Sequence, residues 1–191
     1  IGVCEWDRSL EGKSLSEILE GRTFDVTLSN AAELVLELIE RGGARAIYHA
    51  MDESDVERIM QHPATTIGSD GGISVFEQGV PHPREYGTFP RVLGRYVRDR
   101  GLMTLEEAVR KMSGATAKRL GFLGRGLLRE GFMADIAVFD PERVIDRATF
   151  SKPHQYAEGV EYVVVNGVMV VDGGKHTGAR PGRILYGPGR H

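Results

Sequence analysis

Three stretches near the start of the chain predict helices, and one of them has the period of an amphipathic helix. Apolar side chains recur at steps of three and four over residues 31–39 and stop at Gly42-Gly43, which predicts a helix with a glycine stop. Ser14-Leu-Ser-Glu17 is a capping-box pattern, so a short helix is expected to begin there. Residues 52–61 favour a third helix, which ends before Pro63.

Two short apolar runs alternate with these helices. Residues 44–50 contain Ile and Tyr and predict a buried strand, and Thr65-Thr-Ile-Gly-Ser-Asp70 is a second β-branched stretch that ends in a polar turn. The order helix, strand, helix, strand predicts a parallel α/β architecture. The loop that follows, residues 71–87, is long enough to indicate a function. Helices are expected to resume after Thr88 and after Thr104, where Thr104-Leu-Glu-Glu107 is another capping box.

The last part of the chain has a different character, with frequent glycines and shorter apolar runs. Residues 134–139 and 162–165 predict strands, and the second run meets residues 168–171 across Asn166-Gly167. This dipeptide favours a two-residue hairpin because both positions tolerate positive φ. We therefore expect a small β region, which begins between Gly121 and Gly126.

Composition excludes several classes of partner. The chain has 191 residues with 24 Lys and Arg against 27 Asp and Glu, a formal charge of -3, so no basic field is available for nucleic acid or an anionic membrane. The spacing of Arg91, Arg95, Arg98 and Arg100 along a predicted helix indicates a solvated face. The single cysteine, Cys4, excludes an internal disulfide framework and predicts a core or surface thiol in the reducing cytoplasm. No apolar run is long enough to cross a bilayer.

Asp70 is the strongest candidate for chemistry. It ends a predicted strand and precedes two glycines, the position at which α/β barrels carry their catalytic groups. A carboxylate there can bind a metal ion or accept a proton from a metal-bound water. An ordinary Asp-Gly-Gly turn remains the alternative, because Asp side chains commonly bond their own backbone in turns.

The histidines do not form a recognisable metal site. The six are His49, His62, His82, His154, His176 and His191, and none belongs to a His-x-His or His-Glu-x-x-His motif. His49 ends a predicted strand and either faces a pocket or is a structural, hydrogen-bonded histidine. His62 is expected at a helix end, and the last three are expected to be solvated residues of loops and the tail.

Arg84, in the loop after Asp70, is suited to bidentate binding of a carboxylate, with an ordinary surface arginine as the alternative. Tyr48 and Met51 flank His49 and suit an apolar side-chain pocket, although both residue types are also common core fillers.

Ordered blocks of the sequence resemble one enzyme family. They include Met51-Asp-Glu-Ser-Asp-Val, His62-Pro-Ala-Thr-Thr-Ile-Gly-Ser-Asp-Gly71 and His82-Pro-Arg-Glu-Tyr-Gly-Thr-Phe-Pro-Arg, followed by residues 105–114 and 131–140. These blocks resemble the D-aminoacylase, or N-acyl-D-amino-acid deacylase, family of the amidohydrolase superfamily. The resemblance implies the C-terminal part of a distorted (β/α)8 barrel over residues 1–122, followed by a small β domain over residues 123–191.

The same resemblance implies a role for each candidate residue. Asp70 corresponds to the aspartate that binds the zinc centre and acts as general base, activating the water that attacks the N-acyl amide. Arg84 corresponds to the arginine that binds the substrate α-carboxylate. Tyr48 and Met51, with His49 beside them, correspond to the lining of the side-chain pocket. The implied substrate is an N-acyl-D-amino acid, and the implied cofactor is zinc.

One departure from the family pattern bears on activity. The family's His-x-His pair, its metal-binding cysteine and two further histidines belong to earlier barrel strands, and Cys4 does not match that cysteine. We therefore expect these 191 residues to need the missing barrel segment or self-association, and to be inactive alone. Two alternatives remain open. One is another amidohydrolase, acting on N-acyl-D-glutamate, N-acyl-D-aspartate or a cyclic amide, and the other is a non-catalytic remnant or assembly module.

Overall fold

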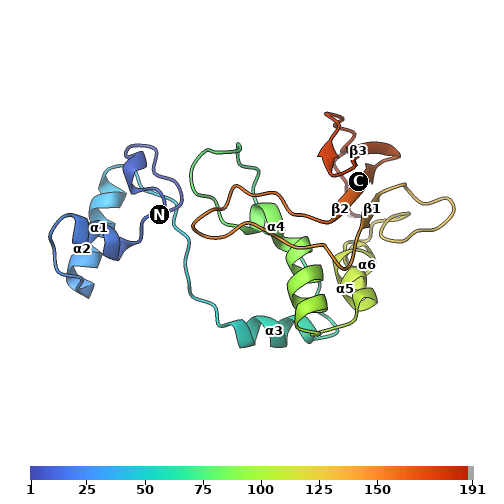
Figure 1. Cartoon of the computed structure of the whole chain (residues 1–191), viewed down its shortest axis with the longest axis horizontal. Coiled ribbons are helices and arrows are strands. Elements are labelled where there is room, and N and C mark those ends of the chain that lie inside the picture. Colours follow the sequence, from blue (N-terminus) through green and yellow to red (C-terminus); the bar gives the residue numbers. More distant parts are fainter. Residues whose placement is uncertain (189–191) are drawn as a thin grey trace. The chain divides into compact units, whose positions relative to one another are not determined.

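A computed structural model describes residues 1–188 as an α/β chain with a small antiparallel sheet (Figure 1). His191, one of the expected tail histidines, lies outside the described residues. The chain forms two compact units, each built from several stretches of sequence. Unit 1 comprises residues 1–50, 71–86 and 148–155, and unit 2 comprises residues 51–70, 87–147 and 156–191. The boundary expected near residue 122 stays a prediction.

Unit 1 contains a short 3-10 helix, η1 (Arg8–Leu10), and the two expected helices α1 (Leu15–Gly21) and α2 (Leu28–Glu40), which pack against each other (Figure 1). The Ser14 capping box is complete: Ser14 Oγ accepts from the Glu17 amide at 3.1 Å, and Glu17 Oε2 accepts from the Ser14 amide at 2.7 Å. Cys4 is fully buried in this core, whose other members are Leu10, Ile18, Leu19, Leu34 and Leu38.

Unit 2 contains the remaining helices, except for residues 84–86 at the start of α4, which belong to unit 1. The expected helix α3 (Glu53–Gln61) ends at His62, as predicted. The helix α4 (Arg84–Arg91) continues into the π-helix η2 (Val92–Asp99), and α5 (Leu105–Met112) and α6 (Gly114–Leu120) follow. The first of these was expected only after Thr88. It begins earlier because His82 Nδ1 accepts from the Arg84 amide at 3.0 Å and Pro83 suits the first helical turn.

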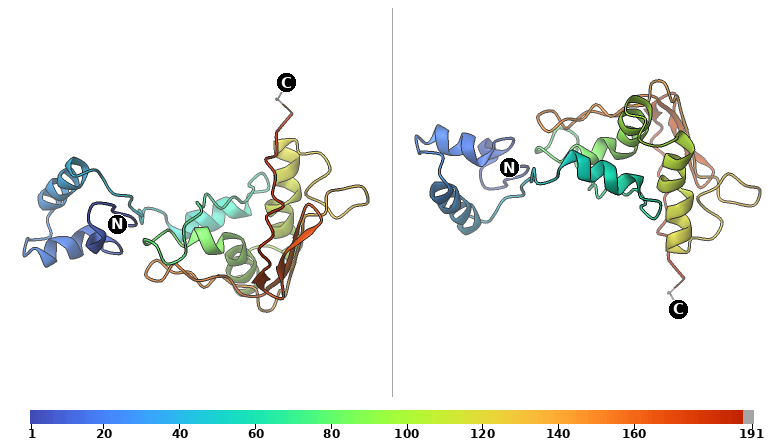
Figure 2. Two further views of the ribbon diagram at one scale, coloured as in Figure 1. Left: turned by 90° about the horizontal axis from the view of Figure 1, so that it is seen from above. Right: turned by 90° about the horizontal axis from the view of Figure 1, so that it is seen from below.

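The sheet of unit 2 has the order β1-β2-β3-β4 and is antiparallel throughout: β1 (Ile136–Phe139), β2 (Val160–Val165), β3 (Val168–Asp172) and β4 (Lys175–His176). The hairpin across Asn166 and Gly167 is confirmed, with φ of 48° and 80°. Both views in Figure 2 place α5 and α6 beside this sheet. The core of unit 2 contains Met60, Val92, Leu93, Tyr96, Ala108 and Val144.

Strands were expected at residues 44–50 and 65–70, but neither is formed in the described chain, so this prediction was wrong. A strand requires a hydrogen-bonded neighbour, and the first segment has only an isolated bridge between Val3 and Arg45. The parallel sheet is therefore absent from the described part of the chain, whereas the α/β class and the small β region are present.

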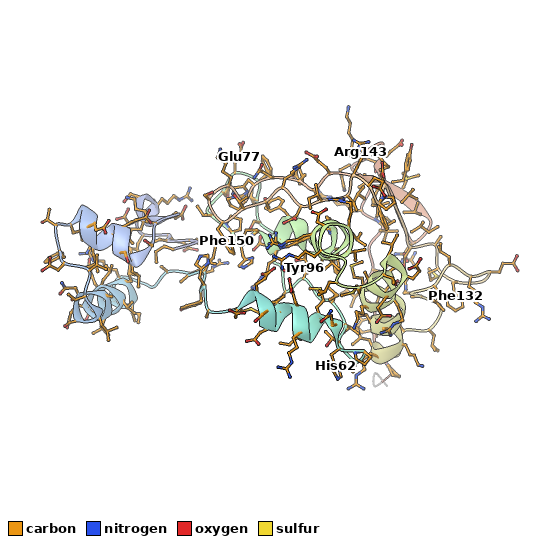
Figure 3. The ribbon with its side chains drawn as sticks, turned by 60° about the horizontal axis from the view of Figure 1, so that its bottom comes forward. His62, Glu77, Tyr96, Phe132, Arg143 and Phe150 are labelled. Atoms are coloured by element: carbon orange, nitrogen blue, oxygen red, sulfur yellow. The ribbon has the colours of Figure 1, made fainter. Side chains whose placement is uncertain are left out.

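The arginines along η2 are ion-paired rather than simply solvated, which corrects the expectation of a solvated face. The Arg91 guanidinium group donates to Asp146 Oδ2 at 2.9 Å. Glu53 Oε1, in α3, accepts from Arg95, Arg100 and the Tyr96 hydroxyl. Figure 3 shows Tyr96 next to α3, where its hydroxyl donates to Glu53. The contacts of Glu53 hold α3 against η2.

No described helix is both long and apolar enough for a membrane span.

Candidate active site

Asp70 is exposed, lies outside the regular helices and strands, and has an unusual backbone conformation. Its φ is 46°, in the left-handed region that few residues other than glycine adopt, although aspartate tolerates it better than most. Side chains held in such conformations concentrate at functional sites, because the surrounding structure must compensate for the strain. The backbone at Asp70 therefore supports a functional position.

The segment that leads to Asp70 is fixed by a fully buried lysine. Lys111 Nζ donates to the carbonyl oxygens of His62 and Thr65, and the Ile67 amide donates to the Lys111 carbonyl at 3.2 Å. Lys111 Nζ also lies 3.6 Å from Glu107. A buried ammonium group is stable only when charged or polar partners replace its water. Lys111 was not identified from the sequence because its role depends on these distant partners.

Arg84 is exposed at the first position of α4, and the loop of unit 1 packs against its backbone. A Cβ placed on Gly71 would lie 3.3 Å from the Arg84 carbonyl oxygen and 3.2 Å from Glu85 Cα. Ser74 Oγ donates to the Glu85 carboxylate at 2.5 Å. Gly71, the residue after Asp70, is thus close to the backbone that carries Arg84, and this close approach favours a residue without a side chain.

Residues 148–155 pack against the same loop. The Tyr86 hydroxyl lies 2.8 Å from His154 Nδ1, and His154 Nε2 lies 2.9 Å from the Gly79 carbonyl oxygen. The expectation that His154 is a solvated loop residue was therefore wrong: it is partly buried and hydrogen-bonded through both ring nitrogens. The rings of His49 and His82 both make edge contacts with Phe150, at 4.6 and 5.1 Å between centroids.

The two predicted pocket residues are strongly exposed. Tyr48 is 84% exposed and Met51 is 79% exposed, so neither is a core residue. Tyr48, His49 and Arg84 belong to unit 1, whereas Asp70 and Met51 belong to unit 2. Within unit 1 the structure brings His49 and His82 to the same ring, that of Phe150.

Unit 2 contains an apolar cavity of about 630 Å³, whose lining includes Phe89, Leu93, Met112, Leu127, Ile136 and Phe139. The cavity lies between α5 and the sheet. None of the residues predicted from the sequence to bind substrate or metal lines it.

Within residues 1–188 there is no group of three or more His, Cys, Asp or Glu side chains that could hold a metal ion. Cys4 is buried among aliphatic side chains of unit 1. The described residues alone therefore do not fit a zinc centre, because such a centre takes about four ligands.

Residues 20–171 match the model of the amidohydrolase family, and the chain belongs to this family. A D-aminoacylase of Alcaligenes xylosoxydans xylosoxydans is 47% identical over 168 residues, which cover 87% of this chain and 34% of that protein. The chain thus spans about a third of the length of this curated relative.

Solved structures give the same result. The structure of a D-aminoacylase with a binuclear metal centre superposes with a TM-score of 0.82 at 44% identity, over 94% of this chain and 35% of that one. An N-acyl-D-glutamate deacylase of Bordetella bronchiseptica, in complex with zinc and a phosphonate inhibitor, superposes with a TM-score of 0.71 at 45% identity. This superposition covers 83% of the present chain and 31% of the Bordetella protein. The similarity therefore extends over most of both units.

Proposed function

We propose that this chain is part of a zinc-dependent amidohydrolase that cleaves N-acyl-D-amino acids to a carboxylate and a free D-amino acid. The observation that carries the proposal is the similarity, over most of the chain, to D-aminoacylases and to an N-acyl-D-glutamate deacylase. The chain spans about a third of these relatives, so the activity is proposed for the complete protein.

Asp70 is the proposed general base. Its carboxylate would accept a proton from the water that attacks the acyl carbonyl and then pass that proton to the nitrogen of the leaving amine. The exposed carboxylate, the left-handed backbone and the anchored segment before it support this role. A base fixed in this way transfers protons without first ordering its own loop.

Arg84 is the proposed anchor for the substrate α-carboxylate, because a guanidinium group can bind both carboxylate oxygens at once. Tyr48, His49 and Met51 are proposed to line the pocket for the D side chain. The high exposure of Tyr48 and Met51 leaves both available for an apolar substrate group.

Zinc is proposed as the cofactor of the complete protein, with Asp70 as one ligand. Since residues 1–188 contain no group of metal ligands, the remaining ligands would come from other parts of that protein. Free N-acyl-D-amino acid is the proposed partner of the site, with neither nucleic acid nor membrane involved.

The proposed architecture is the C-terminal part of a (β/α)8 barrel, residues 1–122, followed by a small β domain, residues 123–191. Exposed apolar side chains support association with the rest of the barrel or with a second copy: Leu28 is 89%, Ile73 104% and Leu123 94% exposed. We place the protein in the cytoplasm, since its single cysteine is buried and free.

The test is the intact mass, zinc content and hydrolytic activity of the complete gene product. Hydrolysis of N-acetyl-D-amino acids but not of their L enantiomers, by a zinc-containing protein longer than this chain, is expected. A preference for N-acyl-D-glutamate would identify the protein as a deacylase for that substrate. A preference for a cyclic amide would contradict the proposal and favour a cyclic-amide hydrolase. An inactive, metal-free product of 21.0 kDa would instead identify a non-catalytic module.

A further inference from the structure

Arg84 lies between two points of its loop that are held by one side chain. Gly79 precedes Arg84 and Tyr86 follows it, and His154 contacts both, through Nε2 to the Gly79 carbonyl at 2.9 Å and through Nδ1 to the Tyr86 hydroxyl at 2.8 Å. All four residues belong to unit 1. His154 comes from residues 148–155, far from the loop in sequence.

The direction of both hydrogen bonds follows from the chemistry of the partners. A carbonyl oxygen only accepts, so His154 Nε2 carries the hydrogen and donates to Gly79. In the neutral ring Nδ1 then has a free lone pair, and the Tyr86 hydroxyl donates to it. The imidazole therefore uses its donor and its acceptor at once, which an apolar ring cannot do.

Aromatic contacts restrict the same group of residues. Phe76, in the loop, packs edge-on against Tyr86 at 6.4 Å and against His154 at 5.6 Å between ring centroids. Phe150, labelled in Figure 3, makes a similar contact with His82, whose Nδ1 accepts from the Arg84 amide. Residues 148–155 thus contact the loop on both sides of Arg84.

We infer that His154 is a positioning residue for Arg84, which fixes the loop so that the guanidinium group meets the α-carboxylate of the substrate. The inference rests on the proposed function. Because displacement of a binding group by about 1 Å can cost up to 10²-fold in rate, a fixed loop favours carboxylate recognition. His154 would thereby set the preference for substrates with a free carboxylate, without touching them.

The test uses His154→Phe and Tyr86→Phe in the complete protein. The first change keeps a ring against Phe76 and removes both hydrogen bonds, and the second removes only the hydroxyl donor. We expect KM for N-acetyl-D-amino acids to rise about 10-fold in His154→Phe, with kcat changed less than about threefold. Tyr86→Phe should shift KM in the same direction and by less. The exposed His176 gives the control His176→Phe, with no expected change.

Two comparisons separate positioning from a general structural role. His154→Phe should not weaken the use of N-acetyl-D-amino acid amides, which lack the carboxylate, and it should add nothing in an Arg84→Ala background. An unchanged KM, an equal loss for acids and amides, or full additivity with Arg84→Ala would each overturn the inference.

A measurement without turnover keeps the result independent of the proposed function. Amide hydrogen exchange over residues 79–86 should be faster in His154→Phe than in the unsubstituted protein and in His176→Phe. Equal exchange would overturn the inference even if the complete protein hydrolyses no N-acyl-D-amino acid. Faster exchange in a protein without deacylase activity would instead retain the loop anchor and reject the proposed substrate.

Discussion

Lys111 Nζ lies 3.1 Å from the carbonyl oxygen of Thr65, in the segment that leads to Asp70. The Lys111 side chain is completely buried, and it also donates to the His62 carbonyl at the end of α3. One ammonium group therefore binds two backbone carbonyls outside the regular helices and strands, and the His62 carbonyl accepts from the Thr65 amide as well. This contact connects α5 to the segment before the proposed base.

Replacement of Lys111 by methionine should destabilise the protein. Methionine fills a similar volume but removes the Lys111 donor from the Thr65 carbonyl and leaves the His62 carbonyl with the Thr65 amide alone, so the free energy of unfolding should fall by about 1–3 kcal/mol. Urea unfolding followed by circular dichroism measures this change. Lys118→Met, on the exposed side of α6, is the matched control and should change stability by less than about 0.5 kcal/mol. Equal midpoints for the two variants would contradict the anchoring role.

Glu107 should make stability depend on acid pH. Its hydrogen bond to Arg110, together with the charges of Arg110 and Lys111, lowers the pKa of the Glu107 carboxyl from 4.5 to about 2. A carboxyl whose pKa is lower in the folded state stabilises the fold above its ordinary pKa. This contribution is lost as pH falls from about 4.5 to about 2.

Glu107→Gln removes this contribution. Its thermal midpoint should lie below that of the unsubstituted protein at pH 7, and the difference should vanish as pH approaches about 2. Thermal unfolding at pH 7, 4 and 2 measures the effect. Glu106→Gln, on the neighbouring exposed residue, is the control. A difference between Glu107→Gln and the unsubstituted protein that persists unchanged at pH 2 would contradict the assignment.

Helix ends could be predicted largely from the sequence, because capping is local. Ser14 forms both bonds of its capping box, as the pattern indicates. Thr104 accepts from the Glu107 amide at 3.2 Å, but the Glu107 carboxylate binds Arg110 instead of returning to the Thr104 backbone. Only the position of Arg110 on the folded helix decides between these two partners, and the capping pattern does not include it.

The pairing of two strands was predictable only where the partner is also local. The hairpin of β2 and β3 follows from Asn166-Gly167, because the turn itself brings the two strands together. Residues 44–50 and 65–70 have the composition of strands, but their state depends on neighbours that are distant in sequence. Composition alone cannot supply such a neighbour.

The residues of the candidate site also differ in whether the sequence could point to them. Asp70 and Arg84 were chosen as candidates because their short motifs resemble a known family. Lys111 lies in one of the resembling blocks, residues 105–114, but that block assigned it no role, and His154 lies outside these blocks. Lys111 contacts Thr65, 46 residues earlier in the sequence, and His154 contacts Tyr86, 68 residues earlier. A pattern search along the chain does not detect such pairs.

Gly94 of η2 should not tolerate a side chain. A Cβ at this position would overlap the Val144 carbonyl oxygen and lie 3.2 Å from Ile145 Cα, both backbone atoms. Gly94→Ala should therefore destabilise the protein by about 1–3 kcal/mol through overpacking. Gly21→Ala in α1 is the control, since nothing lies within 4 Å and alanine favours the helix by up to about 1 kcal/mol. Unfolding midpoints that do not diverge would contradict the close contact.

Asp70 carries the most direct prediction for activity. Asp70→Asn removes the proton acceptor and keeps the shape of the side chain, so kcat for N-acetyl-D-amino acids should fall by about 10²–10⁴-fold while substrate binding is retained. Steady-state kinetics, with binding of a competitive inhibitor measured by calorimetry, separates the two effects. Asp172→Asn, on an exposed aspartate of β3, should leave both unchanged.

The backbone at Asp70 allows the loss of the base to be distinguished from the loss of the fold. Asparagine tolerates the left-handed conformation at φ 46° as well as aspartate does, whereas alanine does not. Asp70→Asn should therefore unfold at the same temperature as the unsubstituted protein, and Asp70→Ala should unfold earlier because about 1 kcal/mol or more of strain is added. Near-normal turnover in a stable Asp70→Asn protein would remove Asp70 from the role of base.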